Sequence, residues 1–200
     1  MKLYYATGAC SLAVHIALRE AALPFELVKV DLASHTTADG RDFYRIAPRG
    51  YVPLLELDDG SRFSEASALM QYVADLQPGR PLIGEPGTIR RLSVCQWLAF
   101  ISTELHKTCS PLWRPDTPEA TRSSAIARLN KAFAELDQLL GQQQWLTGEF
   151  SVADGYAFTV VGWAKTLKLP LDSYPQLQAY LARMAARPAV RAALQAEGLI

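Results

Sequence analysis

Cysteine is scarce in this chain, and neither sign of charge is in excess. The sequence has 3 cysteines among 200 residues, and an odd number at long spacings argues against a disulfide framework and against a zinc cluster. Its 20 lysines and arginines balance 20 aspartates and glutamates, so no global field attracts nucleic acid or an anionic membrane surface. We therefore expect no metal, no nucleic-acid partner and no membrane partner, and we interpret each cysteine as an individual thiol.

Long apolar runs are also missing. The opening Met-Lys-Leu-Tyr-Tyr lacks the charged start and continuous apolar run of a signal peptide, and no later stretch approaches the roughly 18 apolar residues that a membrane helix needs. We therefore expect a cytoplasmic protein. Half of the residues are hydrophobic, which is enough to build a sizeable core.

The beginning of the chain has the pattern of a small α/β domain. A β-rich run over residues 2–6, a glycine turn, a helical pattern over 11–22 and a second β-rich run ending near Leu32 predict a βαβ unit. Residues 51–63 have the signature of a hairpin around an Asp-Asp-Gly turn, and a helix is expected from Ser64 onward. The sheet should therefore contain parallel and antiparallel pairs.

Proline and glycine are concentrated between Gln77 and Gly87, at a density that neither helix nor strand tolerates. Beyond this stretch the apolar periodicity is only that of helices. The predicted domains are an α/β domain over residues 1–78, a linker over 79–87 and an all-α helical bundle over 88–200.

Cys10 is the cysteine whose position suggests reactivity. It follows the turn after the first predicted strand and directly precedes a helix, where free backbone N–H groups and the helix dipole stabilise a thiolate. We therefore expect its pKa to lie below the free-thiol value of about 8.5. The alternative interpretation, a small buried apolar residue, is favoured for Cys95 and Cys109. Because position 13 is alanine, a disulfide of Cys10 would have to join a small molecule or another protein.

Two further segments could bind a ligand through their backbone. Val52-Pro53 stands at the start of a strand, where the proline could form a cis peptide bond or simply mark an edge strand. Glu65 and Ala66 lie at a helix start that offers free N–H groups to a carboxylate, with a side-chain carboxylate for an ammonium group. The alternative for this second segment is an ordinary helix cap.

The helical part of the sequence contains two other notable patterns. Ala99, Thr103 and His106 share one helix face and could line a cleft, although a single histidine near a helix end is more often a surface or capping residue. Ser151 and Asp154 have the spacing of a capping box, which is a folding signal rather than a catalytic one.

Taken together, these residues resemble the glutathione transferase superfamily and, within it, the bacterial beta class. The resembling stretches are Met1–Tyr5, Gly8–Leu12, Gly50–Pro53, Glu104–Lys107, Ser151–Asp154 and Ala196–Ile200. The resemblance implies a thioredoxin-like N-terminal domain that binds glutathione and a helical C-terminal domain that forms most of the second-substrate pocket. It also implies a two-fold homodimer, a cis bond before Pro53, and glutathione as cosubstrate with no permanently bound cofactor.

The resemblance also implies roles for individual residues. Cys10 and His106 would be catalytic, with Cys10 meeting the glutathione sulfur. The backbone of Val52 would pair with the cysteinyl part of the tripeptide, and Glu65 with the N–H of Ala66 would hold its γ-glutamyl end. The full set of expected glutathione-binding residues is Cys10, Ser11, His35, Val52, Pro53, Glu65, Ala66, Ala99, Thr103, Glu104 and His106.

This sequence departs from the family pattern at three of those positions. A lysine is usual where His35 stands, an asparagine where Ala99 stands, and a glycine or serine where Ala66 stands. Other classes of the family have a tyrosine or serine where this chain has Cys10.

Three functions remain open at this point. The first is conjugation of glutathione to an electrophilic, mostly apolar compound. The second is glutaredoxin-like thiol–disulfide exchange through a mixed disulfide of Cys10 with glutathione. The third is a non-catalytic stress protein that binds and sequesters ligands, since fold does not dictate function.

Overall fold

The computed structural model describes all residues, 1–200, and they form two compact units. The first unit contains residues 1–82 and 187–200, and the second contains residues 83–186. No helix in either unit combines the length and the apolar character that crossing a bilayer requires.

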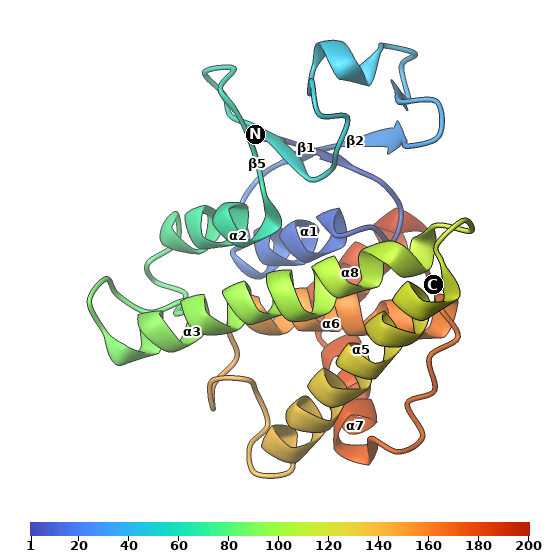
Figure 1. The fold of residues 1–200 in the computed structure, drawn as a ribbon. Coiled ribbons are helices and arrows are strands. Elements are labelled where there is room, and N and C mark those ends of the chain that lie inside the picture. The colour runs from blue at the N-terminus through green and yellow to red at the C-terminus, as the bar shows by residue number, and fades with distance from the viewer. The chain divides into compact units, whose positions relative to one another are not determined.

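A five-stranded sheet of order β3-β2-β1-β4-β5 forms the centre of the first unit (Figure 1). Its strands are β1 (Lys2–Tyr5), β2 (Glu26–Asp31), β3 (Thr36–Thr37), β4 (Leu54–Glu56) and β5 (Arg62–Ser64). β1 pairs in parallel with β2, and all other pairs are antiparallel. The predicted βαβ unit followed by a hairpin is therefore confirmed.

The helices of the first unit lie against this sheet or against one another. They are α1 (Ser11–Glu20), the short 3-10 turn η1 (Phe43–Arg45), α2 (Ala66–Asp75) and α8 (Pro188–Glu197). Both α2 and α8 contact α1. α1 ends two residues before the predicted boundary because Ala22 takes a left-handed φ of 52°, which a helix cannot continue.

The position of α8 differs from the sequence-based division, which placed residues 88–200 in one helical bundle. In the structure α8 packs in the first unit, where the Arg187 guanidinium forms two hydrogen bonds to the Glu20 carboxylate at 2.7 and 2.9 Å. Apolar periodicity shows that a helix has a face to bury but does not identify the surface that covers it.

The second unit consists of helices, as the sequence predicted. They are α3 (Ile89–Phe100), the π-helical turn η2 (Ile101–His106), α4 (Lys107–Cys109), the 3-10 turn η3 (Ser110–Trp113), α5 (Glu119–Leu140), α6 (Val152–Thr166) and α7 (Pro175–Ala185). The π-helical turn was not predicted, because the apolar residues Leu98, Ile101 and Leu105 fit the spacing of an uninterrupted α-helix.

The predicted capping box at the start of α6 is confirmed, and it is part of a larger buried network. Oδ2 of Asp154 accepts hydrogen bonds from the N–H of Ser151 at 2.9 Å and its hydroxyl at 3.2 Å. Oδ1 accepts from the N–H of Leu146 at 3.0 Å and the hydroxyl of Tyr180 at 3.2 Å. Burial raises the pKa of Asp154 to about 6.

Candidate functional site

Cys10 lies in the predicted position, after β1 and directly before the first residue of α1. The turn that leads to it is closed by Ala6, whose carbonyl accepts the N–H of Ala9 at 3.0 Å. The hydroxyl of the fully buried Ser11 also bonds to both backbone groups of Ala6, at 3.2 and 3.3 Å. Ser11 therefore holds the turn that presents Cys10.

The Cys10 thiol is held in its protonated form. Its Sγ donates to the carbonyl of Val52 at 3.2 Å, and burial raises its pKa to about 12. The backbone N–H groups of Cys10 and Ser11 act in the opposite direction, as predicted, and the charge of Glu65 raises the pKa slightly further. The sequence-based expectation of a lowered pKa is therefore wrong for this structure, because burial outweighs the helix N-terminus.

Val52 offers an open backbone edge next to Cys10. The peptide bond from Val52 to Pro53 is cis, as the family resemblance implied. β1 and β4 pair in a register that joins Tyr4 with Leu54, and continuing it would join Ala6 with Val52. The turn before Cys10 already uses both backbone groups of Ala6, so the ladder stops and the N–H of Val52 makes no backbone hydrogen bond. An extended peptide can pair with such an edge.

Glu65 and Ala66 lie at the start of α2. Glu65 has a left-handed φ of 73°, a conformation costing roughly 1–3 kcal/mol that tends to occur at binding sites. Its carbonyl accepts the N–H groups of Ala68 and Leu69, so the N–H groups of Ala66 and Ser67 have no acceptor within the helix. The exposed Glu65 carboxylate lies 3.6 Å from the guanidinium of Arg49. This helix start can therefore receive both a carboxylate and an ammonium group.

His35 is held between Tyr44 and Gly50. The rings of His35 and Tyr44 lie 4.4 Å apart, and a Cβ added to Gly50 would come within 2.9 Å of Nδ1 of His35. Nδ1 is buried and has no hydrogen-bond partner. Because a buried N–H without an acceptor is costly, the neutral ring carries its proton on Nε2, which is the atom left to bind an external acceptor.

His106, in the second unit, ends the π-helical turn and lies in an aromatic cluster. Its Nδ1 is 2.7 Å from the hydroxyl of Tyr156, and its ring packs edge-on against Trp163 with centroids 5.0 Å apart. Trp163 in turn contacts Trp113 at 5.7 Å. Sequence reasoning missed these aromatic partners, although Tyr156 and Trp163 are seven residues apart on α6, a spacing that places two side chains on one helix face.

The other predicted residues of the second unit lie on α3 and the π-helical turn. The hydroxyl of Thr103 donates to the carbonyl of Ala99 at 3.1 Å, and both residues are exposed. Glu104 forms an ion pair with Arg128 at 3.1 Å. The structure therefore brings Ala99 and Thr103 together, whereas His106 contacts α6.

A buried polar network that sequence reasoning also missed links α8 to the turn before Cys10. Glu197 accepts the N–H of Gly8 at 2.9 Å and a hydrogen bond from Nδ1 of His15, also at 2.9 Å. Nε2 of His15 accepts from Nε of Arg19 at 2.8 Å. Since the arginine nitrogen can only donate, His15 carries its proton on Nδ1. The stretch 196–200 contributed to the family resemblance, but its spacing gave no indication of these contacts.

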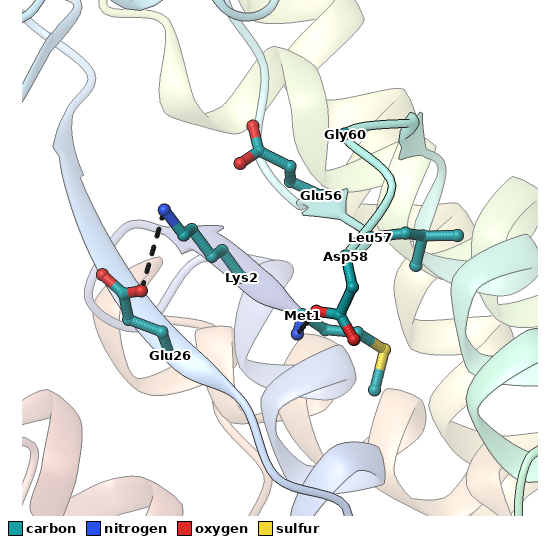
Figure 2. A pocket seen from close by; sticks show the side chains of 7 residues that line it. All are labelled: Met1, Lys2, Glu26, Glu56, Leu57, Asp58 and Gly60. Carbon is teal, nitrogen blue, oxygen red and sulfur yellow. Dashed lines mark hydrogen bonds and ion pairs between the residues drawn. The ribbon is translucent and has the colours of Figure 1, made fainter.

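A separate hollow at the end of the sheet contains none of the candidate residues. Figure 2 shows the side chains that line it, which are Met1, Lys2, Glu26, Glu56, Leu57, Asp58 and Gly60. Its volume is about 370 Å³. The terminal ammonium of Met1 pairs with Asp58 at 2.6 Å, and Lys2 pairs with Glu26 at 3.8 Å. The Met1 ammonium and the Lys2 side chain therefore both form ion pairs with carboxylates that line the same hollow.

Both parts of the chain are similar in sequence to a known protein family. Residues 7–76 match the family model of the glutathione S-transferase N-terminal domain, and residues 100–188 match that of the C-terminal domain. The chain belongs to the glutathione S-transferase family. It is 46% identical to glutathione S-transferase GstA of Escherichia coli O157:H7, over the whole length of both chains.

Solved glutathione S-transferase structures have the same fold. The ternary complex of BphK, a bacterial member, superposes with a TM-score of 0.96 at 48% identity, covering 99% of this chain and all of that one. Two sphingomonad structures, one complexed with glutathione and one described as a beta class enzyme of Sphingomonas chungbukensis, each have a TM-score of 0.95 at 41% identity over both full chains. The predicted fold, the resemblance to the beta class and the prediction of a glutathione transferase enzyme are confirmed.

Proposed function

We propose that this glutathione S-transferase conjugates reduced glutathione to electrophilic, mostly apolar compounds, with thiol–disulfide exchange at Cys10 as a second, slower activity. The observation that carries the proposal is the Cys10 thiol bonded to the carbonyl of Val52, beside a backbone edge open to a peptide. Glutathione would be a cosubstrate rather than a permanently bound cofactor.

The open backbone groups of the first unit match the parts of glutathione. Val52 would pair with the cysteinyl backbone, beside Cys10, Ser11 and Pro53. The free N–H of Ala66 would bind the γ-glutamyl carboxylate, and Glu65 would bind its ammonium group. The Nε2–H of His35 would donate to the glycyl carboxylate. Residues 99, 103, 104 and 106, which lie in the second unit, remain predictions for glutathione binding. The sphingomonad relative complexed with glutathione supports this assignment.

The raised pKa of Cys10 favours conjugation as the main activity. At neutral pH the residue is a thiol and therefore a hydrogen-bond donor. When the glutathione backbone engages the carbonyl of Val52, the S–H of Cys10 can turn to the glutathione sulfur. The N–H groups of Cys10 and Ser11 also favour negative charge at this position. Together these donors would stabilise the glutathione thiolate, which attacks the electrophile.

Exchange is the second candidate because a cysteine, unlike a hydroxyl residue, can form a disulfide. Cys10 would lose its proton to solvent and attack oxidised glutathione, forming a mixed disulfide and releasing one reduced glutathione. A second thiol would then attack the mixed disulfide and restore Cys10. Since only a small fraction of Cys10 is thiolate at neutral pH, this route should be slow.

We also propose a cytoplasmic homodimer. The first unit exposes the large apolar side chains of Tyr51, Phe63 and Tyr72, and the second exposes Ile89 and Leu92. Exposed apolar groups of this kind are commonly covered when subunits associate. The neutral net charge of the chain supports neither a nucleic-acid partner nor a membrane partner.

Turnover of a chromogenic aryl halide with reduced glutathione, compared with reduction of a small glutathione mixed disulfide, tests the proposal. We expect both reactions, with the aryl halide turned over faster. Faster reduction of the disulfide would make exchange the main activity. Glutathione binding without either reaction would indicate the third function, ligand sequestration.

A further inference from the structure

The open backbone edge at Val52 has two ends, and the first unit offers a different kind of partner at each. The pairing of β4 with β5 ends with Ser64 opposite the first residue of β4, so Glu65 at the start of α2 lies beside the residue that follows Val52. On the other side, the ring of His35 lies so close to Gly50 that a Cβ added there would come within 2.9 Å of its Nδ1. Val52 therefore stands between Glu65 and His35.

The two ends of glutathione differ in the same way as the two ends of this edge. The γ-glutamyl end carries an ammonium and a carboxylate, whereas the glycyl end carries only a carboxylate. The start of α2 offers the carboxylate of Glu65 and the N–H of Ala66, which has no acceptor within the helix, whereas His35 offers a single donor. The γ-glutamyl end therefore belongs at α2 and the glycyl end at His35. In this orientation the tripeptide runs antiparallel to β4, as β1 does.

The positive charges of the loop around His35 are already paired with carboxylates. This loop, residues 33–50, contains no lysine and three arginines. Asp31 interacts electrostatically with His35, so a charge on the ring would also be balanced in part by a carboxylate. The glycyl end of glutathione would thus be received by a hydrogen-bond donor rather than by an unpaired cation. The three ion pairs of the loop are Arg41 with Asp39 at 2.8 Å, Arg45 with Asp42 at 3.7 Å and Arg49 with Glu65 at 3.6 Å.

The neutral ring of His35 is a donor of fixed direction. Its backbone has a left-handed φ of 52°, and the ring lies against that of Tyr44 with centroids 4.4 Å apart. Because the buried Nδ1 has no hydrogen-bond partner, the proton is on Nε2. Such an N–H donates to a carboxylate oxygen, and it donates in the same geometry to the carbonyl oxygen of an amide or an ester.

We propose that this enzyme also takes glutathione whose glycyl carboxyl group is blocked as an amide or an ester, and that His35 determines this tolerance. The proposal rests on the function proposed above, in which glutathione binds along Val52. An amide keeps the hydrogen bond from Nε2–H and loses only the part of its strength that comes from a charged acceptor. A lysine ammonium acts as a point charge, so a lysine at position 35 would favour free glutathione over its amide.

Calorimetric titration at pH 8 with glutathione and with its glycyl amide tests the proposal without requiring turnover. The quantity compared is the ratio of the two dissociation constants, in the wild type, His35→Lys and Ala33→Lys. Ala33→Lys is the matched control, because it adds the same charge to the same loop at an exposed residue, whereas the atoms nearest to Gly50 belong to His35 and Tyr44. Conjugation of the aryl halide then gives kcat with each thiol.

We expect the wild type to bind the amide at most about fivefold more weakly than glutathione, the difference between a charged and a neutral acceptor for one hydrogen bond. The two thiols should give similar kcat. In His35→Lys only glutathione should bind more tightly, so the ratio should rise about fivefold, whereas Ala33→Lys should keep the wild-type ratio.

A wild-type ratio above about 50 would overturn the proposal, because only a charged partner of the glycyl carboxylate would explain it. A ratio that is the same in all three proteins, or that rises equally in both variants, would also overturn it. If the ratios behave as expected but neither thiol is conjugated to the aryl halide, the tolerance for a blocked glycyl end stands and the proposed conjugation is what fails.

Discussion

The sulfur of Cys10 is subject to two opposing influences. The N–H groups of Cys10 and Ser11 stabilise negative charge on it, whereas burial and the carboxylate of Glu65 destabilise that charge, and burial has the largest effect. The result is a thiol that donates to Val52. In this respect Cys10 is closer to the hydroxyl residues of other classes of the family than to the reactive thiolate of an exchange enzyme.

His35 is the residue whose replacement should improve glutathione binding. A lysine ammonium carries a full positive charge, whereas the neutral ring of His35 offers only its Nε2–H, so His35→Lys should strengthen the bond to the glycyl carboxylate by about 1 kcal/mol, or roughly fivefold in Kd. Calorimetric titration with glutathione at pH 8 measures this change. Equal or weaker binding would mean that position 35 does not contact the glycyl carboxylate.

At the scale of single elements, the start of α6 depends on Asp154. Its carboxylate accepts from the N–H groups of Leu146 and Ser151 and from the hydroxyl of Tyr180. Asp154→Ala should therefore lower the free energy of unfolding by about 3 kcal/mol, because several buried donors lose their acceptor. Urea denaturation measures the loss. A midpoint equal to that of the wild type would show that other contacts hold the start of this helix.

The same carboxylate should make stability depend on pH. The pKa of Asp154 is raised to about 6 in the folded chain, compared with about 3.9 for an unfolded aspartate. The folded chain thus binds this proton more tightly, and the resulting stabilisation is lost as the pH rises from about 4 to about 6. Relative to Asp154→Asn, which does not titrate, the wild type should lose about 2 kcal/mol across this range. A constant difference between the two proteins would contradict the raised pKa.

Local patterns predicted most elements, and the exceptions have physical causes. The βαβ unit, the hairpin and the Asp154 capping box depend on neighbouring residues, so the sequence was sufficient to predict them. The packing of α8 on α1 depends on pairs such as Arg187 with Glu20, which lie far apart in the chain. The position of Cys10 was likewise predicted, but the burial that raises its pKa depends on distant segments that no local pattern describes.

At the scale of the whole molecule, we expect two copies of the chain to associate as a homodimer. Light scattering at micromolar concentration should give twice the chain mass of 22.0 kDa, since two exposed apolar sets become buried on association. Leu92→Asp, which puts a charge at a side chain that is 68% exposed in the structure, should shift the protein toward monomers. A wild-type protein with the mass of one chain would contradict the dimer.

In the proposed function, Cys10 serves glutathione conjugation as a thiol that donates a hydrogen bond. Steady-state conjugation of the aryl halide by wild type, Cys10→Ser and Cys10→Ala tests it most directly, with mixed-disulfide reduction measured in parallel. Because a serine hydroxyl also donates, Cys10→Ser should keep kcat within about fivefold, whereas Cys10→Ala should lose about 10- to 100-fold through removal of one donor to the thiolate. Both variants should lose exchange. Equal loss of conjugation in Cys10→Ser and Cys10→Ala would contradict the account, because it would mean that the sulfur of Cys10 acts through its own reactivity and not as a donor.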